Sequence, residues 1–492
     1  MVSEPSGRPY VYPDVTTISR RRFLGAVTAG MVATACSPKT AGSPSSVTSN
    51  PPPTTSQAPI PPDWNALRAQ LPGGLVLPDD GGYAVASQSY NPRFDNQRPA
   101  AIARCTSVAD VQRCVETARN ARMPIAARSG GHSYAGYSTP DNGLVVDVRP
   151  MAKIEIDGDK AVIGAGARLM EVYSALAEAG RVLPAGSCPT VGIAGLTLGG
   201  GIGVTARAFG LTCDKLVAAT LVTADGKQHT VDGGDLLWAL KGGGGGNFGI
   251  VTSFTFTTEP APDVTVFALK YPAGSTTDVL GAWQEWAARQ PDEMWSQCTV
   301  SAGSPPGCRI SGALVGDEER CKQLLKTAPR ASSVLIEGKG YLDAMRYFAN
   351  CGPGTCLPKS EGGQVGRDSF VASSRVLAKP VDPDALVDLL DGRSEVDVLL
   401  DSLGGAVGRV APDATAFPHR KAFASAQIYS SASEQDVAEI RDGLPGGTGY
   451  VNYIDPTMPD WAAAYYGDNL QRLQKVAAKY DPDKVFTFAQ AI

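Results

Sequence analysis

Histidine and positive charge are both scarce in this sequence. The 492 residues include only three histidines and no C-x-x-C pair, so the usual ligand sets of zinc are missing and no metal site is predicted. Lys and Arg number 44 against 49 Asp and Glu, a net charge of −5, and no basic stripe with interleaved aromatic residues occurs. This balance argues against a nucleic-acid-binding protein.

The apolar run near the N-terminus is too short to cross a membrane. Residues 23–35 form a stretch of 13, whereas a spanning helix needs ~20. The run follows Ser19-Arg20-Arg21-Arg22-Phe23-Leu24, which matches the twin-arginine export pattern. Residues 1–35 therefore predict a twin-arginine (Tat) signal peptide. This pathway carries proteins that are already folded, which suits a protein that must load a cofactor before export.

Two processing outcomes stay open at Cys36. The preceding Ala33-Thr34-Ala35 fits either a lipobox, which leaves a lipid anchor on Cys36, or an A-x-A site for cleavage and release. Residues 36–62 are rich in Pro, Ser and Thr and predict an unfolded tether. The protein is therefore expected in the cell envelope or secreted, with the lipid as its only membrane contact.

Export also determines whether the cysteines are expected to form disulfides. Once Cys36 and the cysteine of the glycine-rich segment below are set aside, eight remain, an even number in an oxidising compartment. Eight cysteines allow too many pairings for their connectivity to be read. The short spacings of Cys351 with Cys356 and of Cys298 with Cys308 favour these two as local bridges.

Two glycine-rich segments predict ligand loops. Arg128-Ser129-Gly130-Gly131-His132-Ser133-Tyr134 follows an apolar run at 123–127 that predicts a buried strand. The glycine pair allows a sharp turn whose N–H groups bind phosphate, with Arg128 and Ser129 or Ser133 as added donors to a pyrophosphate. The second segment lets the chain approach a flat ligand; it comprises Gly186-Ser187-Cys188-Pro189-Thr190-Val191-Gly192 and Leu198-Gly199-Gly200-Gly201-Ile202-Gly203.

The combination of these motifs resembles the berberine bridge enzyme-like branch of the vanillyl-alcohol oxidase flavoprotein superfamily. The resemblance runs from about Asn91 to Ile492 and is loose between about 260 and 400. It implies FAD bonded to His132 through the flavin 8-methyl group and to Cys188 through flavin C6. Attachment through His132 alone, as in other branches, stays open as an alternative.

The resemblance implies an α+β fold in three parts. These are a PCMH-type two-part FAD-binding domain (63–260), an antiparallel-sheet substrate domain covered by helices (261–447), and a C-terminal element that returns to the FAD domain (448–492). Patterning in the substrate domain points the same way. Residues 264–269 and 396–400 predict strands, and residues 279–289, 317–327 and 382–390 predict helices.

The C-terminal segment matches two further family patterns. Tyr450-Val451-Asn452-Tyr453 has the form Y-x-N-Y, and the residues that begin at Tyr466 have the form Y-x-x-N-x-x-R-L, which implies that Asn452 and Asn469 lie at the cofactor. The segment at 450–455 predicts a tyrosine-rich strand. The complete cofactor set that the resemblance implies is Arg128, Ser129, Gly130, Gly131, His132, Ser133, Cys188, Val191, Gly192, Gly195, Leu198, Gly199, Gly200, Gly203, Ile250, Val251, Tyr450, Asn452 and Asn469.

Tyr453 is the candidate catalytic base. In related enzymes that oxidise alcohols, the second tyrosine of Y-x-N-Y takes the hydroxyl proton while a hydride moves to flavin N5. A free phenol has a pKa near ~10, so Tyr453 needs a lowered pKa or a proton transfer that is concerted with hydride loss. The residue that polarises this tyrosine in the family, an Asp or another Tyr, is not placed by the sequence.

The resemblance also implies an electron acceptor and a substrate class. Val191, three residues after Cys188, implies access for O2 and therefore an oxidase that releases H2O2. The expected substrate is a small molecule with a secondary or hemiacetal alcohol, in a saccharide or a glycosylated or polyketide-like compound. A dehydrogenase with another acceptor and a cell-envelope flavin lipoprotein without turnover are the alternatives. A monomer is expected, with the Tat export machinery as its protein partner.

Overall fold

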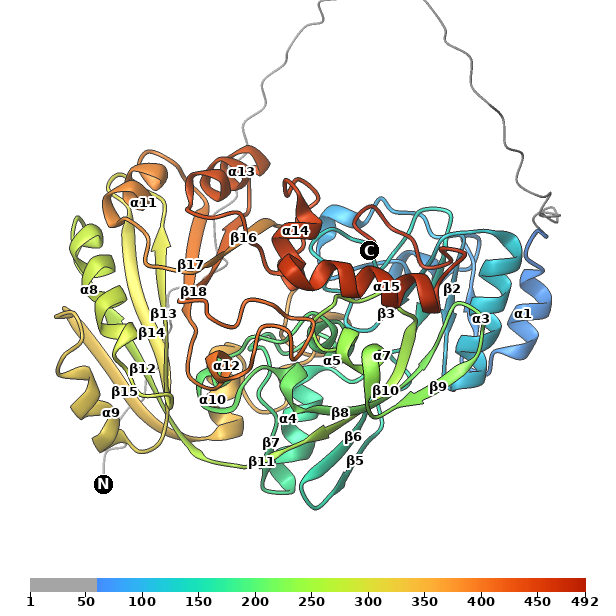
Figure 1. Ribbon diagram of the computed structural model, residues 1–492, viewed down its shortest axis with the longest axis horizontal. Helices are drawn as coiled ribbons and strands as arrows, with labels where there is room; N and C mark the ends of the chain where they lie inside the picture. Colours follow the sequence, from blue (N-terminus) through green and yellow to red (C-terminus); the bar gives the residue numbers. More distant parts are fainter. Residues whose placement is uncertain (1–59) are drawn as a thin grey trace, which may run out of the picture. The chain divides into compact units, whose positions relative to one another are not determined.

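The computed structural model of the protein describes residues 60–492. The predicted signal peptide, Cys36 and nearly all of the tether lie outside the described residues. Within the described range, no helix has the length and apolar character needed to cross a membrane. This part of the chain contains sheets of four, five and seven strands and one two-stranded pair (Figure 1).

The four-stranded sheet supports the His132 loop. Its order is β1 (Leu75–Val76), β2 (Ala101–Arg104), β4 (Leu144–Asp147) and β3 (Ile125–Arg128), and β2, β4 and β3 run parallel. Helix α3 (Val108–Ala121) connects β2 to β3 and starts at Ser107, which forms a reciprocal capping box with Asp110. The predicted strand at 125–127 is confirmed, and the chain enters the His132 loop directly where β3 ends.

The five-stranded sheet supports the Cys188 loop. Its order is β5 (Ile154–Asp157), β6 (Lys160–Gly164), β10 (Ile250–Thr257), β8 (Leu216–Val222) and β9 (Gln228–Val231), all antiparallel. Between β6 and β8 lie α4 (Leu169–Glu178), β7 (Arg181–Val182), the Cys188 loop, α5 (Ile193–Leu198) and α6 (Ala206–Phe209). Helix α7 (Gly234–Ala239) precedes the five-glycine run that leads into β10, and β7 pairs with β11 (Glu259–Pro260).

The seven-stranded sheet is antiparallel throughout. Its order is β15 (Ser333–Gly340), β12 (Asp263–Lys270), β14 (Gly307–Val315), β13 (Met294–Ser301), β17 (Val396–Ser402), β18 (Ala424–Ser430) and β16 (Val371–Leu377). On its outer side lie α8 (Thr276–Ala288), α9 (Glu318–Leu325), α11 (Pro383–Leu390) and α13 (Glu434–Gly443) (Figure 1). The predicted α+β class, with an antiparallel sheet covered by helices, is confirmed.

Side-chain alternation gives this sheet one apolar and one polar face. Along β17, Val398 and Leu400 pack into the core beneath the outer helices, so the intervening Leu399 and the following Asp401 point to the opposite face. On β13 and β18 the same alternation turns Gln297 and Gln427 away from the helices, and Gln427 donates to the Tyr134 hydroxyl of the His132 loop at 2.7 Å. The polar face therefore meets the part of the chain that carries the ligand loops.

The C-terminal segment packs back onto the first half of the chain. Helix α15 (Leu470–Tyr480) contacts α7, and Arg472 pairs with Asp235 at 2.6 Å and lies 4.0 Å over the Trp238 ring. Helix α14 (Trp461–Tyr466) precedes it. The strand predicted at 450–455 is wrong: residues Val451–Tyr453 form a 3₁₀ turn, η4. The backbone N–H of Tyr450 donates to the Ser374 hydroxyl instead of a strand partner.

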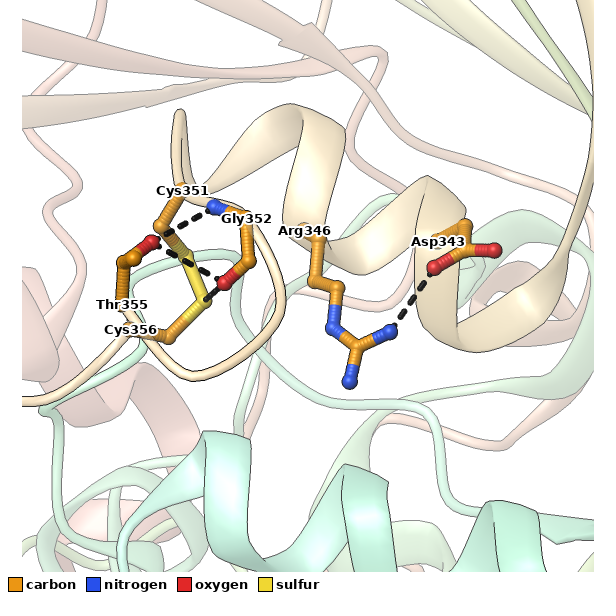
Figure 2. Close-up of a disulfide and its surroundings, with 6 residues drawn as sticks. All are labelled: Asp343, Arg346, Cys351, Gly352, Thr355 and Cys356. Carbon is orange, nitrogen blue, oxygen red and sulfur yellow. Dashed lines mark hydrogen bonds and ion pairs between the residues drawn. A yellow bond between two sulfur atoms is a disulfide. The ribbon is translucent and has the colours of Figure 1, made fainter.

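One of the two expected local disulfides is present. Cys351 and Cys356 are bonded after the end of α10 (Tyr341–Phe348), and the hydroxyl of Thr355 closes the loop by accepting the N–H of Gly352 at 2.8 Å (Figure 2). The pairing of Cys298 with Cys308 is wrong, and both are free thiols. They lie on neighbouring strands but two positions out of register, because the Cα partner of Cys298 is Ile310.

Candidate functional site

A cavity of about 450 Å³ lies where the two glycine-rich loops meet the C-terminal segment. Its size lies in the range of ordinary ligand sites. The structure brings most of the predicted residues to its wall: Ser129, Gly130, Gly131, His132, Ser133, Val191, Gly192, Gly195, Leu198, Ile250, Val251, Asn452 and Tyr453. Sequence reasoning missed the wall segments at 244–247 and 486–489.

His132 is held as a neutral imidazole. Its Nε2 lies 3.0 Å from the Thr190 hydroxyl, and Tyr90 stacks on the ring with the centroids 3.9 Å apart. Burial, helped by the positive charge of Arg168, lowers the pKa of His132 to about 3. Because Nε2 is engaged by Thr190, Nδ1 is the nitrogen left to bond to a ligand.

Cys188 is a half-buried thiol on the other loop. Burial raises its pKa to about 11, and hydrogen bonds from Thr190 oppose this shift. Thr190 therefore touches both of the residues expected to hold the flavin, although the sequence offered no signal for it beyond its place in the motif.

The glycines have two different roles. A Cβ at Gly130 would lie 2.3 Å from the backbone N of Gly192, so this glycine lets the two loops touch. A Cβ at Gly199 would lie 2.1 Å from the Asn452 side chain. At Gly195 a Cβ would meet nothing within 4 Å, although the residue lines the cavity. Gly195 thus leaves open space where a flat ligand can rest, which fits an isoalloxazine ring.

Tyr450 and Asn452 tie the C-terminal segment to the second loop. The Tyr450 hydroxyl accepts hydrogen bonds from the N–H groups of Gly201 and Ile202, at 2.9 and 3.2 Å, and a third from Asn452. Asn452 also donates to the carbonyl of Leu196 at 2.9 Å. Tyr450 lies behind the wall of the cavity, where it fixes the shape of the loop.

Two predicted cofactor residues point elsewhere. Arg128, expected to reach a pyrophosphate, is buried against Asp147 at 3.2 Å and donates to the carbonyl of Ala86 at 2.6 Å. Asn469 donates to the carbonyl of Pro412 at 2.8 Å and supports that loop. The predicted residues outside the cavity wall are Arg128, Cys188, Gly199, Gly200, Gly203, Tyr450 and Asn469.

Comparison with known proteins identifies the family. Residues 99–232 match the family model described as FAD binding domain, and residues 449–492 match the one described as berberine and berberine like. The FAD-linked oxidoreductase YgaK of Bacillus subtilis, itself uncharacterised, is 35% identical over 452 residues, which cover 86% of this chain and 98% of the relative. The chain belongs to the berberine bridge enzyme-like family. It is therefore an FAD-dependent oxidoreductase, and the alternative of a lipoprotein without turnover is not retained.

Other members of the family include enzymes of named specificity. The chitooligosaccharide oxidase of Gibberella zeae is 32% identical over 82% of this chain and 89% of its own. BBE-like 1 of Physcomitrella patens superposes with a TM-score of 0.81 at 30% identity, covering 87% of this chain and 98% of that chain. A glucooligosaccharide oxidase from Acremonium strictum, described with a 6-S-cysteinyl, 8α-N1-histidyl FAD, superposes with a TM-score of 0.79 at 27% identity and the same coverage.

In this berberine bridge enzyme-like protein, Tyr453 lies within range of the charge of an aspartate, Asp401, that the sequence did not reveal. Tyr453 stacks on Tyr134 with the ring centroids 5.4 Å apart. Burial and then the charge of Asp401 raise the pKa of Tyr453 well above its usual value. Burial raises the pKa of Asp401 itself to about 7, although Gln297 donates to its carboxylate at 2.9 Å. A phenol in the cavity wall thus lies near enough to a buried carboxyl group of raised pKa for the charge of that group to act on it.

The other two histidines stay outside this arrangement. His419 bonds through Nε2 to the backbone carbonyl of Tyr465 at 3.1 Å, and burial lowers its pKa to about 4. His229 lies on β9 and packs against the ring of Tyr480. Both therefore have structural roles.

Proposed function

We propose that the protein oxidises a C–OH group of a saccharide or glycosylated compound and passes the electrons to O2, with release of H2O2. The observation that carries this proposal is that Tyr453 shares a cavity wall with His132 and lies within range of the charge of Asp401. A phenol next to a carboxylate provides a route for the proton of an alcohol. The named specificities of the chitooligosaccharide and glucooligosaccharide oxidases support a carbohydrate substrate.

The proposed cofactor is FAD bonded to both His132 and Cys188. Two features support this: Nδ1 of His132 is the nitrogen that Thr190 leaves unengaged, and Thr190 contacts both residues. The glucooligosaccharide oxidase is described with the same two kinds of link. The cradle at Gly195 accommodates the ring, and the wall residues at 244–247 and 486–489 would hold the rest of the dinucleotide. When bound, FAD supplies the hydride acceptor.

In the proposed reaction, Tyr453 accepts the hydroxyl proton of the substrate as the C–H bond breaks. Because its pKa is raised and not lowered, the phenolate is not the resting form. Of the two possibilities the sequence left open, the structure thus supports concerted transfer, in which Tyr453 passes its own proton to Asp401 as it receives that of the substrate. Asp401, with its pKa of about 7, accepts a proton readily near neutral pH.

Val191 supports O2 as the electron acceptor. It lies in the cavity wall, three residues after Cys188. In the family, valine at this position allows O2 to reach the flavin. The competing proposal is a dehydrogenase with another electron acceptor. We also propose the domain boundaries given above, a monomeric state, export by the Tat pathway and a lipid on Cys36.

The experiment begins with exported protein from the membrane or medium fraction. It is denatured in acid, freed of small molecules, and analysed by absorbance and peptide mass mapping. One FAD that joins the His132 and Cys188 peptides is expected, whereas released flavin, or flavin on the His132 peptide alone, contradicts the bicovalent link. Peroxide release is then measured with glucose, cellotetraose and chitotetraose. Tyr453→Phe is expected to lose turnover and keep its flavin, and peroxide from none of the saccharides contradicts the proposed substrate class.

A further inference from the structure

Thr190 lies between the two residues proposed to carry the flavin, and its backbone is fixed from both sides. The residue is buried, with 5% of its surface exposed. The carbonyls of Pro189 and Val191, its chain neighbours, accept hydrogen bonds from the N–H groups of Met170 and Leu169, at 3.1 and 3.0 Å. These N–H groups belong to the first turn of α4, where the helix itself offers them no partner. Thr190 is therefore held in a defined position.

The hydroxyl of Thr190 contacts His132 on one side and Cys188 on the other. Its Oγ1 lies 3.0 Å from Nε2 of His132. The same hydroxyl and the backbone N–H of Thr190 both hydrogen-bond to the sulfur of Cys188. A hydroxyl carries one proton, so it donates only once. When that proton points to the sulfur, the oxygen is left to accept a hydrogen bond from Nε2–H of His132.

This order of donors and acceptors prepares both side chains to act as nucleophiles. A neutral imidazole carries its proton on one nitrogen only, so Nε2–H leaves a lone pair on Nδ1 of His132. The nucleophilic form of a cysteine is the thiolate. Burial and the charge of Asp368 oppose this form by raising the pKa of Cys188 to about 11, whereas the hydrogen bonds from Thr190 and from the N–H of Val191 favour it.

We propose that Thr190 is a positioning residue for both covalent links, because its hydroxyl accepts a hydrogen bond from His132 and donates one to Cys188. This inference rests on the proposed function. In each link, Nδ1 or the sulfur forms a bond to a flavin carbon. One proton leaves the side chain and one leaves that carbon. The two electrons pass to the flavin and then to O2, which takes up both protons as H2O2.

The test replaces Thr190 in the exported protein and measures the flavin that remains attached after denaturation in acid. Thr190→Val keeps the shape of the side chain and removes the hydroxyl, whereas Thr190→Ser keeps the hydroxyl. The fraction of protein with both links should fall about tenfold in Thr190→Val and stay at the wild-type level in Thr190→Ser. Thr230→Val, at an exposed position on β9, is the matched control and should change nothing. Equal attachment in Thr190→Val and wild type overturns the inference.

Two backgrounds separate the two contacts of the hydroxyl. In Cys188→Ala only the link to His132 can form, and in His132→Ala only the link to Cys188. Peptide mass mapping then counts each link with and without Thr190→Val. Both links should fall by about the same tenfold factor, because each loses one hydrogen bond. A fall in only one of the two backgrounds overturns the shared role of Thr190.

The pH dependence distinguishes positioning from general damage to the fold. His132→Ala/Thr190→Val protein with flavin still bound is incubated in air at pH 7 and at pH 10. Because both values lie below the pKa of Cys188, the thiolate fraction rises about 1,000-fold between them, and the sulfur link should form at pH 10. In Cys188→Ala/Thr190→Val the link to His132 should stay low at both values, because the imidazole is already neutral at pH 7. No recovery of the sulfur link at pH 10 overturns the inference.

The same measurements keep this inference distinct from the proposed function. Wild-type protein without covalent flavin contradicts the proposed cofactor and the role of Thr190 together. Wild-type protein with both links that releases no peroxide from saccharides contradicts the proposed substrate class alone.

Discussion

Replacing Asp401 with Asn should lower turnover and raise the melting temperature of the protein above neutral pH. The folded protein raises the pKa of Asp401 from 3.8 to about 7, so the protonated form of the buried side chain predominates only below about pH 7. The stabilisation from this extra proton is complete below about pH 4 and is lost as the pH rises through about 7. A shift of about three units corresponds to ~4 kcal/mol. Asn has the same shape, carries no charge, and can still accept the hydrogen bond from Gln297.

Thermal unfolding at pH 4, 6 and 8 provides the assay. The wild type should lose stability over this range, whereas Asp401→Asn should not, so that the two melting temperatures coincide at pH 4 and differ at pH 8. With an unfolding entropy of ~2 cal/mol/K per residue, the difference at pH 8 is on the order of 4 °C in favour of the variant. Turnover should fall in the same variant because Tyr453 loses its proton acceptor. A variant that is less stable than wild type at pH 8 would refute the reasoning.

Three further substitutions have distinct expected outcomes. Arg420→Met removes the fully buried guanidinium that pairs with Asp214 at 2.7 Å. It should lower the free energy of unfolding in urea by about 3–5 kcal/mol, because Asp214 loses its partner. A loss below about 1 kcal/mol would contradict a large contribution of this ion pair to stability. Gly195→Leu should fill the cavity and abolish flavin absorbance while far-UV circular dichroism stays normal, whereas Gly81→Leu at an exposed open position should keep the flavin. Ser107→Ala should cost about 1 kcal/mol in the same urea assay through loss of the α3 cap, with turnover unchanged.

Local patterns in the sequence predicted much of the secondary structure. The helices predicted at 317–327 and 382–390 are present as α9 and α11, because capping and apolar periodicity depend on neighbours in the chain. The segment at 450–455 was misread because its tyrosines and hydrogen-bond donors are satisfied by side chains from distant parts of the chain, such as Ser374. No local pattern reports such partners.

The motifs predicted that His132, Val191 and Tyr453 lie at one site. They did not predict the groups that shift the pKa values of His132 and Tyr453. Asp401 lies one residue beyond the strand predicted at 396–400, and alternation with Val398 and Leu400 assigns it to the polar face. The sequence alone does not reveal which end of that face meets Tyr453, since this depends on how the sheet docks. The ion pair of Arg128 was not predicted for the same reason, because its partner Asp147 lies on the adjacent strand.

The wall of the cavity has a consequence for the timing of biosynthesis. Its two sides come from residues 125–251 and from residues 451–454 and 486–489. A nascent chain that has completed only its first half therefore exposes both glycine-rich loops without the segment that encloses them. The site proposed for the flavin is therefore enclosed only once residue 489 has left the ribosome. A chain that ends before this residue lacks part of the cavity wall.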